Sequence, residues 1–158
     1  MIQEDVDDYF FFGHSKFLPN VIVENQILQL LEKIVGESKV EFYLGGYGNF
    51  DSFAYSCCKK YKQNHPNSTL VFVTPYLSET YLKERESLYD KITYPNIEGK
   101  SLKYAISYRN EYMVDVSDFI ISYVKHDYGG AYKAISSAKR KGKVIYNLAQ
   151  SPLSAPCF

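Results

Sequence analysis

The chain has 158 residues, enough for one domain with a buried core and too few for two ordinary domains. Its 18 basic and 18 acidic residues balance, which argues against a protein that coats nucleic acid and gives no reason to expect binding to a membrane surface. The three cysteines, two of them adjacent, match neither a disulfide framework nor a zinc site, so we expect a reduced, cytoplasmic setting and no bound metal.

Short apolar runs alternate with segments of helical spacing, which predicts βαβ units around a parallel sheet. The expected strands are Tyr9–Phe12, Val40–Leu44, Leu70–Thr74, Phe119–Val124 and Val144–Leu148. The expected helices are Ile22–Val35, a segment from Asn49 or Asp51 to about Asn64, Ser78–Tyr89, Ser101–Val116 and Ala131–Lys141, with a loop at Ile92–Gly99. The predicted fold is therefore α/β: a Rossmann-like, doubly wound, mainly parallel five-stranded sheet flanked by helices. Residues 1–148 are expected to form this single domain, and residues 149–158 an irregular tail.

Aromatic residues are unusually frequent, with 16 Tyr and 10 Phe but no Trp. Two interpretations are open. The rings can simply build the core and the surface, or some Tyr rings can stack on a nucleobase or line an interface between copies of the chain.

Three predicted strands are followed by loops that contain glycine: Gly13-His14-Ser15, Gly45–Asn49 and Gly129-Gly130. In a doubly wound sheet the carboxyl ends of the strands share one edge, where ligands bind, so we expect these loops to converge on one crevice. Glycine lets backbone N–H groups approach a phosphate at the positive end of the following helix. One such glycine is usually only a turn, and the three loops together carry the prediction.

Two common nucleotide-binding fingerprints are absent. The run Gly46-x-Gly48 lacks the third glycine of a dinucleotide-binding loop, and the sequence contains no GxxxxGK[ST] phosphate loop. A standard NAD dehydrogenase and a P-loop NTPase are therefore disfavoured, and no cofactor is predicted.

Four motifs in order resemble the SLOG superfamily: FGHS (Phe12–Ser15), GGYGNFDSFA (Gly45–Ala54), RNEYMVDVSDFIISY (Arg109–Tyr123) and GGAYKAISSAKRKGKVIYNL (Gly129–Leu148). The similarity is nearest to the YpsA-like branch, with the Lonely Guy phosphoribohydrolases as more distant relatives. It extends from about Phe10 to Leu148 and is weakest between Thr74 and Lys100. The resemblance implies a Rossmann-like domain, often dimeric, that binds nucleotides, nucleoside monophosphates or ADP-ribose-like signals.

The resemblance also assigns roles to single positions. Gly129-Gly130-Ala131 would correspond to a phosphate-gripping Gly-Gly-Thr turn, with Ala131 lacking the hydroxyl, so that phosphate binding would depend more on backbone N–H groups. Ser15 stands where a basic residue is common. Arg109 matches a functional Arg of the Lonely Guy enzymes, but Tyr132-Lys133-Ala134 offers no carboxylate where those enzymes carry a catalytic Glu. This departure disfavours glycosidic hydrolysis, which needs a carboxylate.

Three side chains have competing interpretations. Arg109 is either a solvated helical charge or a bidentate ligand for a phosphate or ribose-linked group. Asp51 is either an acid favoured by the start of its helix or an acceptor for ribose hydroxyls. His14, which follows a strand at the expected crevice, is the histidine that we expect to contact the ligand.

The sequence thus predicts a protein that binds an ADP-ribose-type or cyclic nucleotide signal without catalysis, including sequestration of an immune signal as an anti-defence protein. The alternatives are an N-glycosidase or phosphoribohydrolase, for which Arg109 is the candidate catalytic residue, and an oligomeric scaffold with a vestigial site. The expected partners are a nucleotide-type small molecule and further copies in a homodimer or higher homo-oligomer, with no nucleic acid and no membrane. The predicted ligand-binding residues are Gly13, His14, Ser15, Gly45, Gly46, Tyr47, Asn49, Asp51, Arg109, Asn110, Gly129, Gly130, Ala131 and Tyr132.

Overall fold

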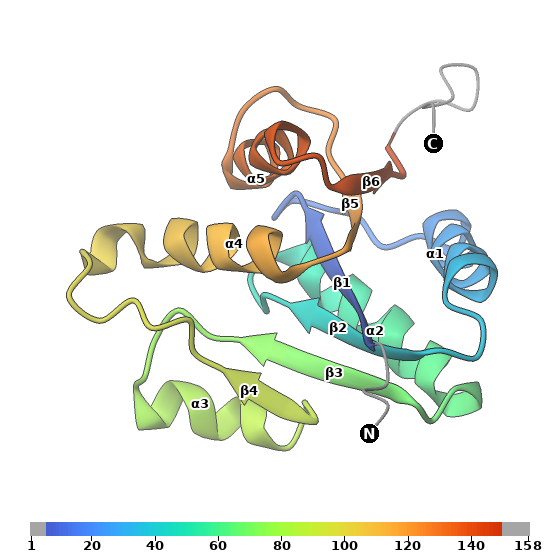
Figure 1. Cartoon of the computed structure of the whole chain (residues 1–158), viewed down its shortest axis with the longest axis horizontal. Helices are drawn as coiled ribbons and strands as arrows, with labels where there is room; N and C mark the ends of the chain where they lie inside the picture. Colours follow the sequence, from blue (N-terminus) through green and yellow to red (C-terminus); the bar gives the residue numbers. More distant parts are fainter. Residues whose placement is uncertain (1–5, 150–158) are drawn as a thin grey trace, which may run out of the picture.

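Six strands form one parallel sheet in the computed structural model, which describes residues 6–149. In chain order the elements are β1 (Val6–Gly13), α1 (Val21–Ile34), β2 (Lys39–Leu44), α2 (Asn49–Asn64), β3 (Ser68–Val73), α3 (Glu79–Glu86), β4 (Lys91–Thr93), the 3-10 turn η1 (Leu102–Tyr104), α4 (Ala105–Val116), β5 (Phe119–Tyr123), α5 (Gly130–Arg140) and β6 (Val144–Asn147). The strand order is β4-β3-β2-β1-β5-β6, and every neighbouring pair is parallel. The chain steps outward from β1 to β4 and returns through α4 to place β5 and β6 on the other side of β1 (Figure 1).

Both faces of the sheet are covered, which explains why β1 has a continuous aromatic run and no polar alternation. Successive side chains of a strand point to opposite faces. Tyr9 and Phe11 join a core cluster with α1 and α2, whereas Phe10 and Phe12 join a second cluster with α4 and α5. The predicted α/β, doubly wound class is confirmed.

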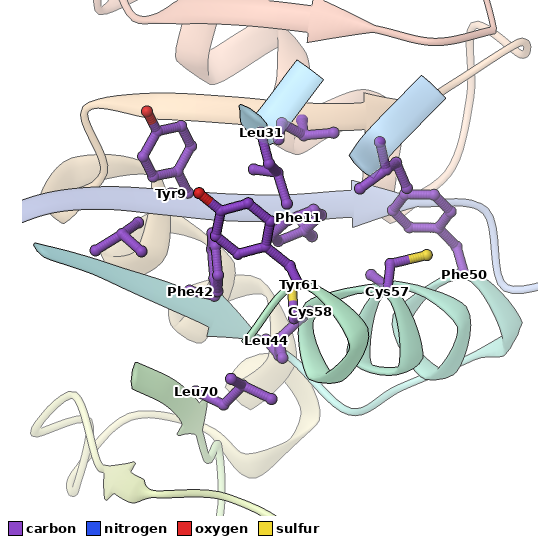
Figure 2. Close-up of a cluster of buried hydrophobic side chains, with 14 of the residues drawn as sticks. Tyr9, Phe11, Leu31, Phe42, Leu44, Phe50, Cys57, Cys58, Tyr61 and Leu70 are labelled. Carbon is purple, nitrogen blue, oxygen red and sulfur yellow. The ribbon is translucent and has the colours of Figure 1, made fainter. Parts of the chain in front are cut away.

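The core beneath α1 and α2 absorbs much of the aromatic content (Figure 2). Tyr9 stacks on Phe119 with ring centroids 4.9 Å apart and meets Phe42 edge to face. Cys57 and Cys58 of α2 are fully buried among these rings, and burial raises the pKa of the Cys57 thiol to about 12. Such thiols pack as small apolar groups and have no appreciable thiolate character at neutral pH.

The expected loop at Ile92–Gly99 is partly wrong, because Lys91–Thr93 forms β4 and pairs with Val71–Val73 at the edge of the sheet. A three-residue edge strand carries too little periodicity to be recognised in a sequence. The helix expected over Ser78–Tyr89 ends at Glu86, and the one expected from Ser101 begins with η1 before α4. The tail predicted for residues 149–158 lies almost wholly outside the described residues and, like the single-domain boundary, stays a prediction. Within residues 6–149, no helix combines the length and apolar character needed to cross a membrane.

Arg109 fastens α4 to the carboxyl ends of two strands. Its Nη1 donates hydrogen bonds to the carbonyl oxygens of Gly45, just after β2, and Val73, the last residue of β3, at 2.7 and 3.0 Å. Its Nε donates to Oδ1 of Asn110 at 3.0 Å, and the side chain as a whole is only 2% exposed. The interpretation of Arg109 as a solvated helical charge is therefore wrong.

Replacing Arg109 by Ala should destabilise the domain strongly. The change leaves the two buried carbonyls without their donor, and we expect unfolding free energy to fall by about 3–5 kcal/mol, the cost typical of breaking a buried charged network. Urea unfolding measures this. Arg140→Ala, at an exposed position of α5, is the matched control and should shift stability by about 0.5 kcal/mol or less. Equal unfolding midpoints for the two variants would contradict this role of Arg109.

Glycines at the sheet edge should differ in their tolerance of a side chain. A Cβ added at Gly13 would overlap the ring of Phe50, whereas a Cβ at Gly130 would meet nothing within 4 Å. Gly13→Ala should therefore cost about 1–3 kcal/mol through overpacking, and Gly130→Ala should leave stability unchanged or raise it by about 0.5–1 kcal/mol. Thermal unfolding of both variants tests the contrast, and a destabilised Gly130→Ala protein would contradict the open surroundings of Gly130 at the start of α5.

Candidate ligand-binding site

A cavity of about 340 Å³ opens at the carboxyl edge of the sheet. It lies beside the junction of β1 and β5, where the strand order reverses and where ligands of doubly wound sheets bind. Eleven of the fourteen predicted residues line it: Gly13, His14, Ser15, Gly45, Tyr47, Asp51, Arg109, Asn110, Gly129, Gly130 and Ala131. Gly46, Asn49 and Tyr132 do not line this cavity. The expected convergence of the three loops is thus present in the structure.

The glycines after β1 and β2 mainly allow the loops to pack against one another. A Cβ at Gly46 would come within 2.7 Å of the Phe72 ring, and one at Gly48 within 2.7 Å of the Ser15 Cα. The first amide of α2 is also occupied, since Asn49 N donates to the carbonyl oxygen of Ser15 at 2.9 Å. Close packing therefore accounts for the glycines of the Gly46–Asn49 turn, and the expected approach of this turn to a phosphate stays a prediction.

The start of α5, in contrast to the turn before α2, is not crowded by other residues. Gly129 is the N-cap, with a positive φ of 92° that favours glycine, and no side chain caps the helix. A Cβ built at Gly129 or Gly130 would meet nothing within 4 Å, so the turn is open. The first hydrogen bond of the helix runs from Lys133 N to Gly129 O, which leaves the amides of Gly130, Ala131 and Tyr132 without an intrahelical acceptor. Such a helix terminus attracts anions.

Asp51 and Arg109 are buried charged residues that line the cavity, and both lie close to Gly45. A Cβ at Gly45 would lie 3.2 Å from Oδ2 of Asp51 and 3.1 Å from Nη2 of Arg109. Asp51 is 9% exposed, and its Oδ2 accepts a hydrogen bond from Tyr47 N at 2.8 Å. Burial raises the pKa of the Asp51 carboxyl to about 7, against the opposing effects of the Tyr47 amide and the Arg109 guanidinium. Asp51 therefore fixes the loop after β2 and places a titratable carboxyl in the cavity.

Aromatic rings line the side of the cavity next to α5. His14 and His126 lie with ring centroids 4.3 Å apart, and His126 stacks on Tyr128 at 4.9 Å. Tyr47, from the loop after β2, and Tyr128 are 61% and 67% exposed, so both rings have free faces. Tyr128 lies directly before Gly129-Gly130 in the sequence, a position that could have identified it.

The cavity has further lining residues that sequence reasoning did not assign: Phe10, Phe11, Phe12, Lys16, Ile106, His126 and Tyr128. Lys16 is an exposed cation within the loop between β1 and α1. No local pattern marks it, because its neighbourhood depends on how that loop bends after Ser15. Among the described residues, no cluster of His, Cys, Asp and Glu side chains has the arrangement of a metal site.

Comparison with known proteins identifies the fold. No family model and no curated protein matches the sequence. The structure is similar to DNA processing protein A (DprA) from Streptococcus pneumoniae, at 11% identity and a TM-score of 0.66 over 94% of this chain and 52% of that one. It is also similar to DNA processing protein A from Helicobacter pylori, at 15% identity and a TM-score of 0.60 over 92% and 66% of the two chains. A third similar structure, TM1055, has 13% identity and a TM-score of 0.56 over 88% and 72%.

The chain spans less than two thirds of either DNA processing protein, and at such identities the likeness concerns the fold alone. That shared fold is Rossmann-like, and the resemblance of the motifs to the SLOG superfamily stays a prediction. Assignment to the YpsA-like branch stays a prediction.

The expectation that nucleic acid is not a partner needs correction. Two of the similar structures are DNA processing proteins, and the one from Helicobacter pylori has a single-stranded DNA binding mode. The expectation was based on the balanced charge of the whole chain, which does not report how charges are distributed over one edge of the sheet. A neutral net charge therefore does not exclude nucleic acid from proteins of this fold.

Proposed function

We propose that this protein binds a phosphate-bearing nucleotide in the cavity, with a phosphate at the start of α5. The observation that carries this proposal is the open Gly129-Gly130 turn, where no side chain caps the helix and a Cβ at either glycine would meet nothing within 4 Å. Backbone N–H groups at a helix N-terminus bind phosphate through both hydrogen bonds and the helix dipole. This is the arrangement expected when no side-chain hydroxyl is present at Ala131.

The remaining walls suit the base and the sugar of the same ligand. The exposed rings of Tyr47 and Tyr128 can stack on a nucleobase, and the Asp51 carboxyl can accept hydrogen bonds from ribose hydroxyls. A cavity of about 340 Å³ is near the lower end of the range for small-molecule sites, which favours one nucleotide unit over a larger ligand.

The nucleotide unit in the cavity belongs either to a free signal, such as the AMP part of an ADP-ribose-type molecule or a cyclic nucleotide, or to one residue of a single strand. The SLOG resemblance supports the first source and the DNA processing proteins of similar fold support the second. A site that holds a signal intact would sequester it. Isothermal titration with ADP-ribose, AMP, cyclic AMP and a thymidine oligonucleotide separates the sources, and no binding by any of the four would contradict the proposal.

Gly130→Asp tests the phosphate position. The new carboxylate repels an anion from the start of α5, and we expect affinity for the best ligand of that panel to fall at least about tenfold, or about 1.4 kcal/mol. An acid in the first turn of a helix is otherwise stabilising, so the melting temperature should be unchanged or higher. Gln63→Glu is the control. It adds the same charge at an exposed position in the last turn of α2, at the end of α2 opposite to its start near the cavity, and should leave affinity unchanged. Undiminished binding by Gly130→Asp would place the phosphate elsewhere.

A second candidate function, cleavage of an N-glycosidic bond, is favoured by Asp51. The sequence offers no carboxylate after Gly129-Gly130, but the structure supplies one from α2 in the same cavity, with a pKa of about 7 that suits general acid–base catalysis. Chromatography of the ligand after incubation distinguishes the functions. Ligand recovered intact supports a binder, whereas conversion that falls about 100-fold or more in Asp51→Asn supports an enzyme.

Asp51→Asn should also change the pH dependence of stability. Because the folded-state pKa of about 7 lies above the ordinary value, ionising Asp51 destabilises the fold progressively as pH rises from about 4 to 7. The variant should therefore unfold at higher urea concentration than the parent protein at pH 8, with the difference shrinking towards pH 4. The reverse trend would show that Asp51 is stabilised as a carboxylate.

A further inference from the structure

His14 joins the loop after β1 to the loop between β5 and α5. Its Nε2 accepts a hydrogen bond from Lys125 N at 2.7 Å and a longer one from His126 N at 3.3 Å. The backbone of His14 is also tied to β5, since His14 N donates to Tyr123 O at 3.4 Å. The loop from Lys125 to Tyr128 leads directly into Gly129-Gly130, so the contact with His14 fixes the segment that precedes the open turn.

These contacts set the protonation state of the imidazole. A ring nitrogen that accepts backbone N–H groups carries no proton, so the neutral ring must carry its proton on Nδ1. Protonating Nε2 would direct an N–H group at two other N–H groups and break both hydrogen bonds. The loop contact and a charged His14 are therefore mutually exclusive.

The surroundings of His14 favour its neutral form. Burial lowers the pKa of His14 below the usual histidine value, and the neighbouring His126 and Lys125 lower it further. Lys16 and Arg109 line the same cavity and add positive charge, while Asp51 is the carboxyl among its lining residues. The contact is thus present while His14 is neutral, and it is lost as the pH falls through the lowered pKa of His14.

We propose that His14 is a positioning residue whose neutral imidazole holds the Lys125–Tyr128 loop in place, and that anion binding at Gly129-Gly130 weakens when His14 becomes protonated. This inference rests on the proposed function for its ligand, but the hold of His14 on the loop can be measured without one.

The expected pH dependence is opposite to that of simple electrostatics. Adding positive charge to His14 and neutralising the Asp51 carboxylate beside an anion should strengthen binding at acidic pH. Release of the loop should weaken it, because the amides at the start of α5 are no longer held together in a binding arrangement. Since the two effects have opposite signs, the direction of the change identifies which of them dominates.

Nuclear magnetic resonance of the ¹⁵N-labelled full chain tests the contact first. At pH 7.5 we expect His14 to carry its proton on Nδ1, and the amide signals of Lys125 and His126 to move with the His14 titration at a midpoint below about 6.5. A proton on Nε2 at pH 7.5, or amide signals that ignore the titration, would overturn the role of His14.

Sulfate, which does not titrate between pH 5 and 8, is the anion probe, followed by the amide shifts of Gly130 and Ala131. Sulfate affinity should fall at least about fivefold from pH 7.5 to pH 5, about 1 kcal/mol. His14→Gln keeps an acceptor that does not titrate and should remove this fall, whereas His14→Phe keeps a ring beside His126 but no acceptor and should bind weakly at both pH values. His126→Asn, the control for the neighbouring imidazole, should retain the fall.

Affinity that rises on acidification, or a fall that persists unchanged in His14→Gln, would overturn the inference. The proposed function can fail separately. If sulfate moves no amide at the start of α5 at either pH while the His14 signals behave as expected, the anion site is wrong and the loop contact stands.

Discussion

The pairing of β1 with β5 is the constraint on which the candidate site depends. The register places Gly13 opposite Tyr123, so the chains leaving the two strands begin side by side although they lie 110 positions apart in the sequence. His14 then meets the amides of Lys125 and His126, and the loop between β5 and α5 is led to the cavity. On the other side of β1, Arg109 holds the ends of β2 and β3 beneath α4. Main-chain hydrogen bonds between the strands thus bring the loops around the cavity together. The side chains of His14 and Arg109 then hold these loops in place.

Two glycine-rich turns that look alike in the sequence have different physical roles. Gly46 and Gly48 are required because aromatic and backbone atoms crowd them, whereas Gly129 and Gly130 border open space. Each of the two turns lies between a strand and a helix, so local sequence cannot distinguish them. The difference depends on Phe72 and Ser15, residues from other loops or strands that approach only in the folded chain.

Much of the architecture is readable from the sequence, because strands buried on both faces give continuous apolar runs such as YFFF in β1. The sheet edge that carries the cavity also follows from those strands together with the rule for doubly wound folds. The roles of individual side chains were less accessible. Arg109 was expected to face solvent or a ligand, yet it satisfies two main-chain carbonyls, a partnership set by tertiary packing. Balanced net charge likewise gave a wrong exclusion of nucleic acid, because composition contains no spatial information.

A crystal structure of the protein with AMP tests the site most directly. The account predicts that phosphate oxygens lie at hydrogen-bonding distance, about 2.7–3.2 Å, from the amide nitrogens at Gly130 and Ala131, with the base near Tyr47 or Tyr128. A phosphate bound at the start of α2, or an AMP molecule outside the cavity, would contradict it.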